Sequence, residues 1–331
     1  MSEMTRLQNF RSAVPVPTDL RAEEERLMAA LVADEPKVHK VRPRRLYVGL
    51  AAGIAAAAVA AAAGALTVSD EPGGVVHTMP VAHVQLLQQA ADAAGHDVQE
   101  LHPKPGQFLV YKSQTMDPVE GGGGRYLSRS VRTIWLPVSG DATGGVLRTD
   151  VLEPKPYPGW PVPPEARQGA GKSSQGKAAD FDQRAEWLRN DFTYLSRLPA
   201  KAPRMYEHLY SHLGKGPQAD AQAWQNLGGM LTEAYMPAAQ RKALFQAASA
   251  IPGVTAVGKA VDAAGRTGVA VALTLPGSGE RQEYIFDPKS YQYLGERIVV
   301  TDAAIAKAPV GSVLTSSAQL SVRVADSAPA R

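Results

Sequence analysis

An uncharged run from Leu46 to Val68 constrains this chain more than any other feature of its sequence. Its 23 residues include no charged side chain, no side-chain amide and no proline. At about 1.5 Å of rise per residue, a helix of this length is roughly 35 Å long, which exceeds the about 30 Å of a bilayer's hydrocarbon core. We therefore expect one transmembrane helix with Leu46 and Val68 at its two ends.

The charges on the two sides of this run differ in sign. Asp70 and Glu71 follow it, whereas the nine residues before it contain no carboxylate. Lysine and arginine stay on the cytoplasmic side of a membrane, so the pattern predicts a cytoplasmic N-terminus and an extracytoplasmic C-terminal part. The predicted cytoplasmic charge anchors are Lys37, Lys40, Arg42, Arg44 and Arg45.

Two alternatives concern the same run. A secretory signal peptide also combines basic, apolar and small residues, but its apolar part is typically about 7 to 15 residues long and lies near the chain start. Here 45 residues come before the run, which favours a retained anchor over a cleaved signal. Gly49 and Gly53 have the spacing that lets two helices approach closely, so a homodimer through the span stays open.

The composition excludes several classes of site. The formal net charge is only +3 and part of the basic excess precedes the span, so nucleic-acid binding is not indicated. The chain has no cysteine, which excludes disulfides, thiolate zinc sites and cysteine nucleophiles. About 260 residues follow the span, enough for one substantial domain or two small ones.

Residues 1–45 form the predicted cytoplasmic head. A helix is expected from Thr18 to Glu35, capped by Thr18 or Asp19 and ended by Pro36. Such a helix either lies against lipid headgroups or docks a cytosolic protein, and both interpretations remain open. The side chains for docking, which fall along one side of the helix, are Leu20, Leu27, Met28 and Leu31.

The rest of the chain predicts an α+β domain with an antiparallel sheet, for which a curved, half-barrel-like form is an alternative. In chain order we expect a spacer (69–79), a helix and three strands (80–152), a Pro/Gly-rich linker or surface excursion (153–179), a helical block (180–250), a four-stranded antiparallel meander (251–301) and a partly disordered tail (302–331). The meander strands are expected at Val254–Val261, Gly268–Leu275, Gln282–Asp287 and Tyr291–Thr301. Within the tail, Ser312–Val324 is expected to add an edge strand, and Trp135 is expected to anchor the core.

Three groups of polar side chains are the candidate chemical sites: His208 with His212, Asp180 with Asp182 and Glu186, and Asp287 with Glu296. The histidines are four residues apart on a predicted helix, as two metal ligands can be, but no third ligand is evident. The first acidic group lies at a helix start, where the helix dipole favours acids. The second flanks the last hairpin, where a solvated turn explains it. We therefore predict no catalytic residue, no metal site, no cofactor and no enzymatic activity.

Several segments of the outer part share a pattern: PGQFLVYKS (Pro105–Ser113), TIWLPVSG (Thr133–Gly140), LPAKAP (Leu198–Pro203), MPAAQRKALFQAASAIPGV (Met236–Val254), DAAGRTGVAVAL (Asp262–Leu273) and YIFDPKSYQYLGER (Tyr284–Arg297). With the order of basic head, single span and outer domain, they resemble a family of actinobacterial membrane-anchored proteins of unknown function. Members of that family are often encoded beside extracytoplasmic-function RNA polymerase sigma factors. The order of sheet and helices is also similar to that of the curved lipoprotein-carrier domains in some periplasmic sigma-pathway sensors.

The resemblance implies a regulator of an envelope-responsive sigma factor and brings no catalytic residues with it. Many anti-sigma heads are larger and carry a His and Cys zinc motif, whereas this head has no cysteine. A contact with a sigma factor would therefore use the Thr18–Glu35 helix. We expect a non-enzymatic, membrane-anchored extracytoplasmic sensor or regulator with a cytosolic partner. The alternative is an anchored carrier or binding module for an apolar cell-envelope ligand.

Overall fold

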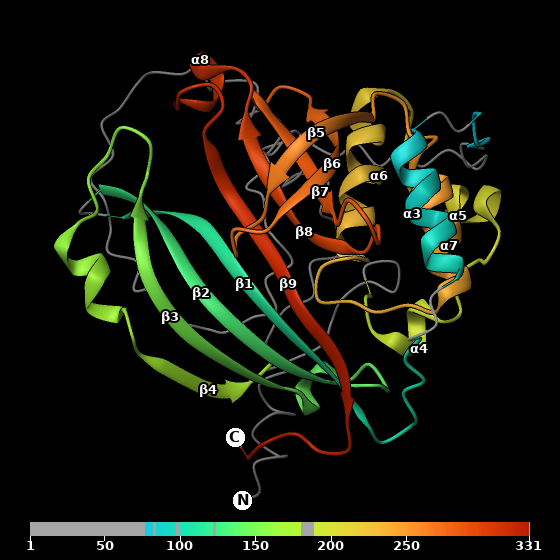
Figure 1. Cartoon of the computed structure of the whole chain (residues 1–331), viewed down its shortest axis with the longest axis horizontal. Coiled ribbons are helices and arrows are strands. Elements are labelled where there is room, and N and C mark those ends of the chain that lie inside the picture. The colour runs from blue at the N-terminus through green and yellow to red at the C-terminus, as the bar shows by residue number, and fades with distance from the viewer. Residues whose placement is uncertain (1–76, 82–83, 97–99, 122–123, 180–188, 331) are drawn as a thin grey trace, which may run out of the picture. The chain divides into compact units, whose positions relative to one another are not determined.

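A nine-stranded antiparallel sheet is the main element of the computed structural model (Figure 1). The structure describes residues 77–81, 84–96, 100–121, 124–179 and 189–330, all of which belong to one compact unit. The strand order is β4-β3-β2-β1-β9-β8-β7-β6-β5, and the sheet is open. Helices accompany the sheet, so the α+β class and the antiparallel pairing predicted from the sequence are confirmed.

The strands and helices have the following bounds. The strands are β1 Phe108–Gly121, β2 Gly124–Pro137, β3 Val146–Pro156, β4 Ser173–Lys177, β5 Thr255–Val261, β6 Thr267–Leu275, β7 Glu280–Phe286, β8 Tyr293–Val300 and β9 Val313–Ala325. The α-helices are α3 Gln85–Gly95, α4 Phe192–Leu195, α5 Ala202–Leu209, α6 Pro217–Gly229, α7 Ala238–Ala248 and α8 Ala303–Ala306. Two 3₁₀ helices are η1 Ala142–Gly144 and η2 Pro164–Gly169.

The C-terminal strand β9 joins the two halves of the sheet. It pairs with β1 on one side, where Thr115 faces Ser317, and with β8 on the other, where Arg297 faces Ser316. Figure 1 shows β9 crossing the domain between these two strands. The prediction of an edge strand over Ser312–Val324 is wrong, because hydrogen bonds occupy both of its edges. The strand groups expected before and after the helical block thus form one continuous sheet.

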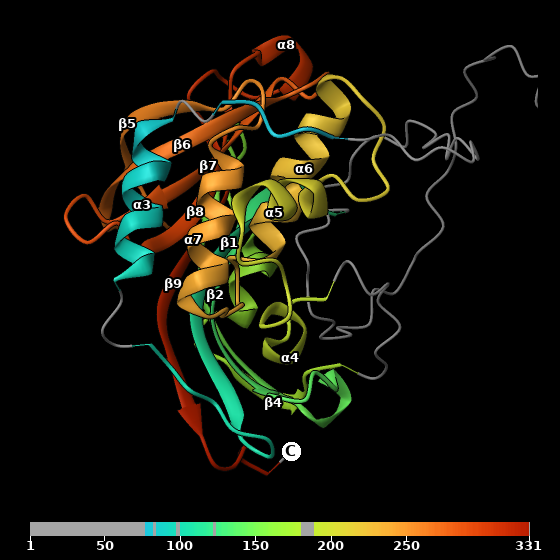
Figure 2. The same cartoon turned by 90° about the vertical axis from the view of Figure 1, so that its right-hand side faces the viewer.

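Helices α3, α6 and α7 pack against one face of β6, β7 and β8, and α5 packs against α7 and α6 (Figure 2). Trp224 of α6 contacts Tyr284 of β7 with ring centroids 4.5 Å apart, and Phe245 of α7 meets Phe286 edge-on at 5.5 Å. All four side chains are buried, and burying an aromatic ring of this size contributes about 2 kcal/mol. Trp135, expected in the core, is only partly buried.

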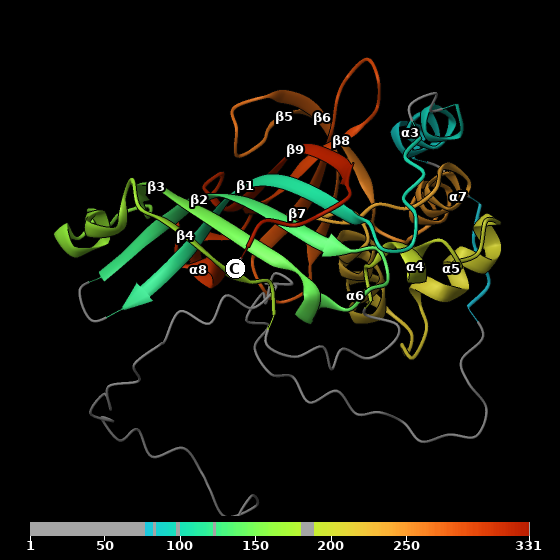
Figure 3. The same cartoon turned by 90° about the horizontal axis from the view of Figure 1, so that it is seen from below.

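The stretch predicted as a linker or surface excursion contains regular structure. Strand β3 continues to Pro156, and β4 pairs antiparallel with β3 from Ser173 to Lys177. Between them η2 lies on the surface with no buried residue. Figure 3 shows β3 and β4 on the side of the sheet away from α5, α6 and α7. This stretch therefore supplies one edge of the sheet.

No helix within the described ranges is both long and apolar enough to cross a membrane. The predicted span Leu46–Val68, the charge anchors before it and the docking side chains of the Thr18–Glu35 helix lie outside the described residues. The acidic group that begins at Asp180 lies outside them as well.

Candidate functional site

Polar side chains from five strands and from the loop after α6 meet inside the domain, where the helices adjoin the middle of the sheet. We name them the junction cluster: Ser113, Arg132, Thr232, Glu233, Gln282, Tyr293, Glu296 and Ser317. The sheet register brings them to one face, since Ser113 pairs with Arg132 and Thr115 pairs with Ser317. The cluster therefore connects the helical block to both halves of the sheet.

Glu233 holds the loop after α6 on the sheet. Its carboxylate accepts a 2.6 Å hydrogen bond from the Ser113 hydroxyl and lies 3.5 Å from Nη2 of Arg132. The two charged side chains are 12% and 9% exposed, so the pair is nearly buried. Glu233 has a φ of 49°, in the left-handed region that side chains other than glycine rarely adopt. Such strain persists only where surrounding contacts hold it, and here the partners come from β1 and β2.

Glu296 is the second buried carboxyl group of the cluster and is 7% exposed. Gln282 Nε2 donates a 3.1 Å hydrogen bond to Oε2 of Glu296. The backbone N–H of Glu296 donates to the Ser317 hydroxyl at 3.2 Å. Burial, followed by the negative charge of Asp117, raises the pKa of Glu296 to about 7, although hydrogen bonds from Gln282 and Thr232 oppose the rise. This carboxyl group therefore changes charge near neutral pH.

The expectation that a solvated turn explains Asp287 and Glu296 holds only for Asp287. That carboxylate accepts hydrogen bonds from the N–H groups of Lys289 and Ser290, which lower its pKa. Glu296 instead lies opposite Tyr284 on the face of the sheet that the helices cover. The sequence of β8 carried no clear signal, because Val299 is buried as well as Ile298 and Val300, so its residues do not alternate between a buried and an exposed face.

A third buried carboxylate, Glu283, has a different environment on the opposite face of the sheet. Arg281 Nη2 lies 2.6 Å from its Oε1, and Arg297 Nε lies 2.8 Å from its Oε2. Two guanidinium groups thus compensate the negative charge of Glu283. Among the described residues Glu296 has no ion pair, so no cation compensates the negative charge that it carries when ionised.

Several polar atoms of the junction region have no hydrogen-bond partner among the described residues. They are Nε and Nη2 of Arg132 and the side-chain carbonyl oxygens of Gln282 and Gln319. A buried polar group without a partner costs about 1–3 kcal/mol. A network with free donors and acceptors can therefore exchange partners when a charge in it changes.

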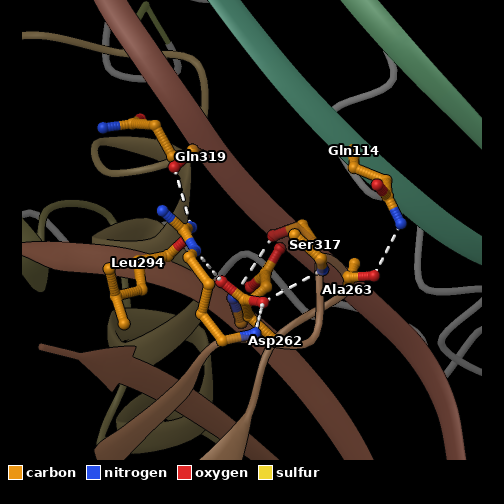
Figure 4. Close-up of polar contacts among 9 residues, drawn as sticks. Gln114, Asp262, Ala263, Leu294, Ser317 and Gln319 are labelled. Atoms are coloured by element: carbon orange, nitrogen blue, oxygen red, sulfur yellow. Dashed lines mark hydrogen bonds and ion pairs between the residues drawn. The ribbon is translucent and has the colours of Figure 1, made fainter.

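The turn between β5 and β6 fixes the part of β9 that enters the cluster (Figure 4). The Ala263 N–H donates to the Ser317 carbonyl oxygen at 3.3 Å. Nη2 of Arg266 donates to the carbonyl oxygens of Leu294 at 2.8 Å and Gln319 at 2.9 Å. Asp262, whose Oδ2 accepts from Arg266 Nε at 2.7 Å, holds the guanidinium in place. We name this arrangement of Asp262 and Arg266 the turn clasp.

The two histidines considered as metal ligands, His208 and His212, lie in different environments. His208 is partly buried and burial lowers its pKa, whereas His212 is exposed. The described residues contain no group of three histidine, aspartate or glutamate side chains placed to hold a metal ion. The chemistry that the junction cluster offers is the uptake and release of a proton at Glu296.

No protein-family model and no curated protein sequence matches the chain. Two solved structures are similar to it: the Pseudomonas aeruginosa MucA/MucB complex and MucB in complex with MucA(peri). Each match has 14% identity and a TM-score of 0.24, and covers 74% of this chain. The matches cover 58% and 56% of those chains, so this chain spans somewhat more than half of their length. An overlap of this size does not establish a shared function.

Proposed function

We propose that this chain is a non-enzymatic regulatory protein anchored in the cell membrane by Leu46–Val68. The described domain lies outside the membrane and responds to a condition there. The predicted head helix contacts a cytosolic partner, for which a sigma factor is the first candidate. The anchor and its orientation rest on the uncharged run and on the basic residues before it.

The junction cluster is the observation that carries the proposal. It buries two carboxyl groups and one guanidinium group between the helices and the sheet, and Glu296 titrates near neutrality. Its members come from segments that are far apart in the sequence. A change of charge at this position therefore alters how the loop with Thr232 and Glu233 is held on the strands, as a switching element requires.

The carrier alternative lacks comparable support in the described residues. The face of β1 and β2 beside the cluster carries hydroxyl groups, and Thr115 and Ser130 are within hydrogen-bond distance of one another at 3.1 Å. Ser128 lies on the same face by strand parity. Because sites for apolar ligands are lined mainly by apolar and aromatic side chains, this face does not favour such a ligand.

Site-specific photocrosslinking of the full chain in its native cells tests the proposal. A photoreactive residue at Leu27 is on the apolar side of the predicted head helix, and the same residue at Glu25 is the matched control on another side. Mass spectrometry identifies what each position captures. We expect a sigma factor or its regulator from Leu27, little from Glu25, and loss of capture when Leu31→Asp is added.

Recovery of lipid alone at Leu27 would overturn the proposed output through the head. Equal capture at Leu27 and Glu25 would also contradict it, because the apolar side would then have no special role. An unchanged yield in Leu31→Asp would remove this side of the helix as the contact.

A further inference from the structure

Three large apolar side chains are exposed around one corner of the domain: Trp160 at 48%, Ile305 at 51% and Val310 at 66%. We name them the apolar rim. They surround a small buried cluster in which Tyr157 packs with Ala308 and residues of β8 and β9. Trp160 follows Tyr157 in the loop after β3, whereas Ile305 and Val310 stand on either side of Ala308. The rim thus combines two segments that are distant in the sequence.

The start of the described chain lies on the same side of the domain as α8, away from the C-terminus. His77 stacks on Tyr210 with ring centroids 4.5 Å apart, and its Nε2 lies 3.2 Å from the Leu213 carbonyl oxygen. Val81, which is 89% exposed, follows in this segment. In Figures 1 and 2 this segment and α8 both lie on the side of the domain away from the C-terminus, on opposite sides of its centre in Figure 1.

The length of chain between the predicted span and His77 limits how far this end can lie from a membrane. Eight residues, 69–76, separate Val68 from His77. At about 3.5 Å per extended residue they reach at most roughly 30 Å. This limit rests on the proposed anchor, and it keeps the His77 end of the domain near the bilayer.

One exposed basic side chain stands among the apolar side chains of the rim, and another lies near the His77 segment. At the rim, Lys307 is exposed and lies between Ile305 and Val310. Lys215, also exposed, lies away from the rim, two residues after the Leu213 that His77 contacts. Asp302 stands at the start of the same segment as Lys307 and keeps its negative charge, while its carboxylate accepts hydrogen bonds from the N–H groups of Ala304 and Ile305. Basic side chains beside exposed apolar ones, with a tryptophan among them, are typical of surfaces that contact the headgroup region.

We propose that this end of the domain rests on the outer surface of the bilayer, with Trp160, Ile305 and Val310 in the headgroup region. The membrane, and not a second protein, is the partner of this surface. The domain is then held in one orientation over the membrane.

Single-cysteine labelling tests the orientation, because the chain has no cysteine of its own. Val310→Cys and Ile305→Cys report on the rim, and Lys104→Cys is the exposed control in the loop before β1, near the C-terminal end of β9. The full chain is labelled with bimane and reconstituted into vesicles of phosphatidylcholine and phosphatidylglycerol that carry headgroup-level nitroxide lipid. We expect fluorescence to fall about twofold at both rim positions and to stay unchanged at position 104.

Flotation of the same vesicles separates this inference from the proposed anchor. Protein that does not float with the vesicles would contradict the anchor itself. Protein that floats, but is quenched equally at positions 310 and 104, would overturn the orientation alone. Protection of the rim from a water-soluble quencher without quenching by lipid would indicate a protein on this surface and would also overturn the inference.

Discussion

The Ser113 hydroxyl donates a 2.6 Å hydrogen bond to the Glu233 carboxylate, although 120 residues separate the two in the sequence. One residue belongs to the first strand of the sheet and the other to the loop that ends the α6 helix. This bond and the ion pair with Arg132 on the next strand attach the loop to the middle of the sheet at Glu233, whose backbone is in the left-handed region. The junction cluster therefore couples the position of the helical block to the charge state of the sheet interior.

The stability of the domain should fall as pH rises through the titration of Glu296. Between the ordinary pKa of 4.5 and about 7, the folded protein holds this proton and the unfolded chain does not. Over that interval the free energy of unfolding therefore falls by up to about 3 kcal/mol. Glu296→Gln, which stays neutral, should remove this loss. Urea denaturation at pH 5 and pH 8 measures the difference.

The matched control for that measurement is Glu153→Gln, because Glu153 is exposed on β3. It should retain the pH dependence of the parent protein. A Glu296→Gln variant with the parental pH dependence would show that Glu296 titrates elsewhere.

The Arg132–Glu233 pair should show measurable coupling in a double-mutant cycle. With both side chains nearly buried, Arg132→Met and Glu233→Gln should give a coupling free energy of about 2 kcal/mol. The exposed pair Arg204–Glu207, whose side chains are 72% and 42% exposed, should give less than about 0.5 kcal/mol. Equal coupling in the two cycles would contradict a special role for the buried pair.

The turn clasp should require arginine at position 266. Lysine keeps the charge but cannot bond Asp262, Leu294 and Gln319 together, because it lacks the planar guanidinium. Arg266→Lys should lower the free energy of unfolding by about 2 kcal/mol. Hydrogen exchange at the Ala263 amide, which bonds to β9, should become faster. Arg323→Lys at an exposed position of β9 should change neither quantity, and a stable Arg266→Lys would refute the clasp.

Two neighbouring glycines at the end of α6 should respond oppositely to alanine. A Cβ at Gly228 would clash with the Tyr284 hydroxyl, which donates to the Trp224 carbonyl oxygen at 2.9 Å. Gly228→Ala should therefore lower the melting temperature and cost more than about 2 kcal/mol. A Cβ at Gly229 meets nothing within 4 Å, so Gly229→Ala should be neutral or stabilise the helix by about 0.5 kcal/mol. Adding Tyr284→Phe should partly restore the stability of Gly228→Ala.

Local patterns predicted many of the elements because the forces behind them are local. Alternating apolar residues between turn sequences predicted strands that nearly match β5 and β6, where the expected Gly268–Leu275 compares with Thr267–Leu275. The histidine pair, by contrast, shared a predicted helix, yet His212 lies beyond the end of α5 with a φ of 63°. Spacing along a sequence indicates a shared helix face only while the helix continues.

The sequence by itself determined the antiparallel α+β class, the order of the strands within the last meander and the uncharged run before the outer domain. These follow from residue periodicity, turn composition and the absence of charge. Only the tertiary structure decided that β9 is central and that Glu296 is buried. Strands pair through backbone N–H and C=O groups, which are the same for every residue except proline. The local sequence therefore does not distinguish a central strand from an edge strand. The burial of Glu296 depends on a loop more than 60 residues earlier in the chain, which covers a face that the local pattern leaves open.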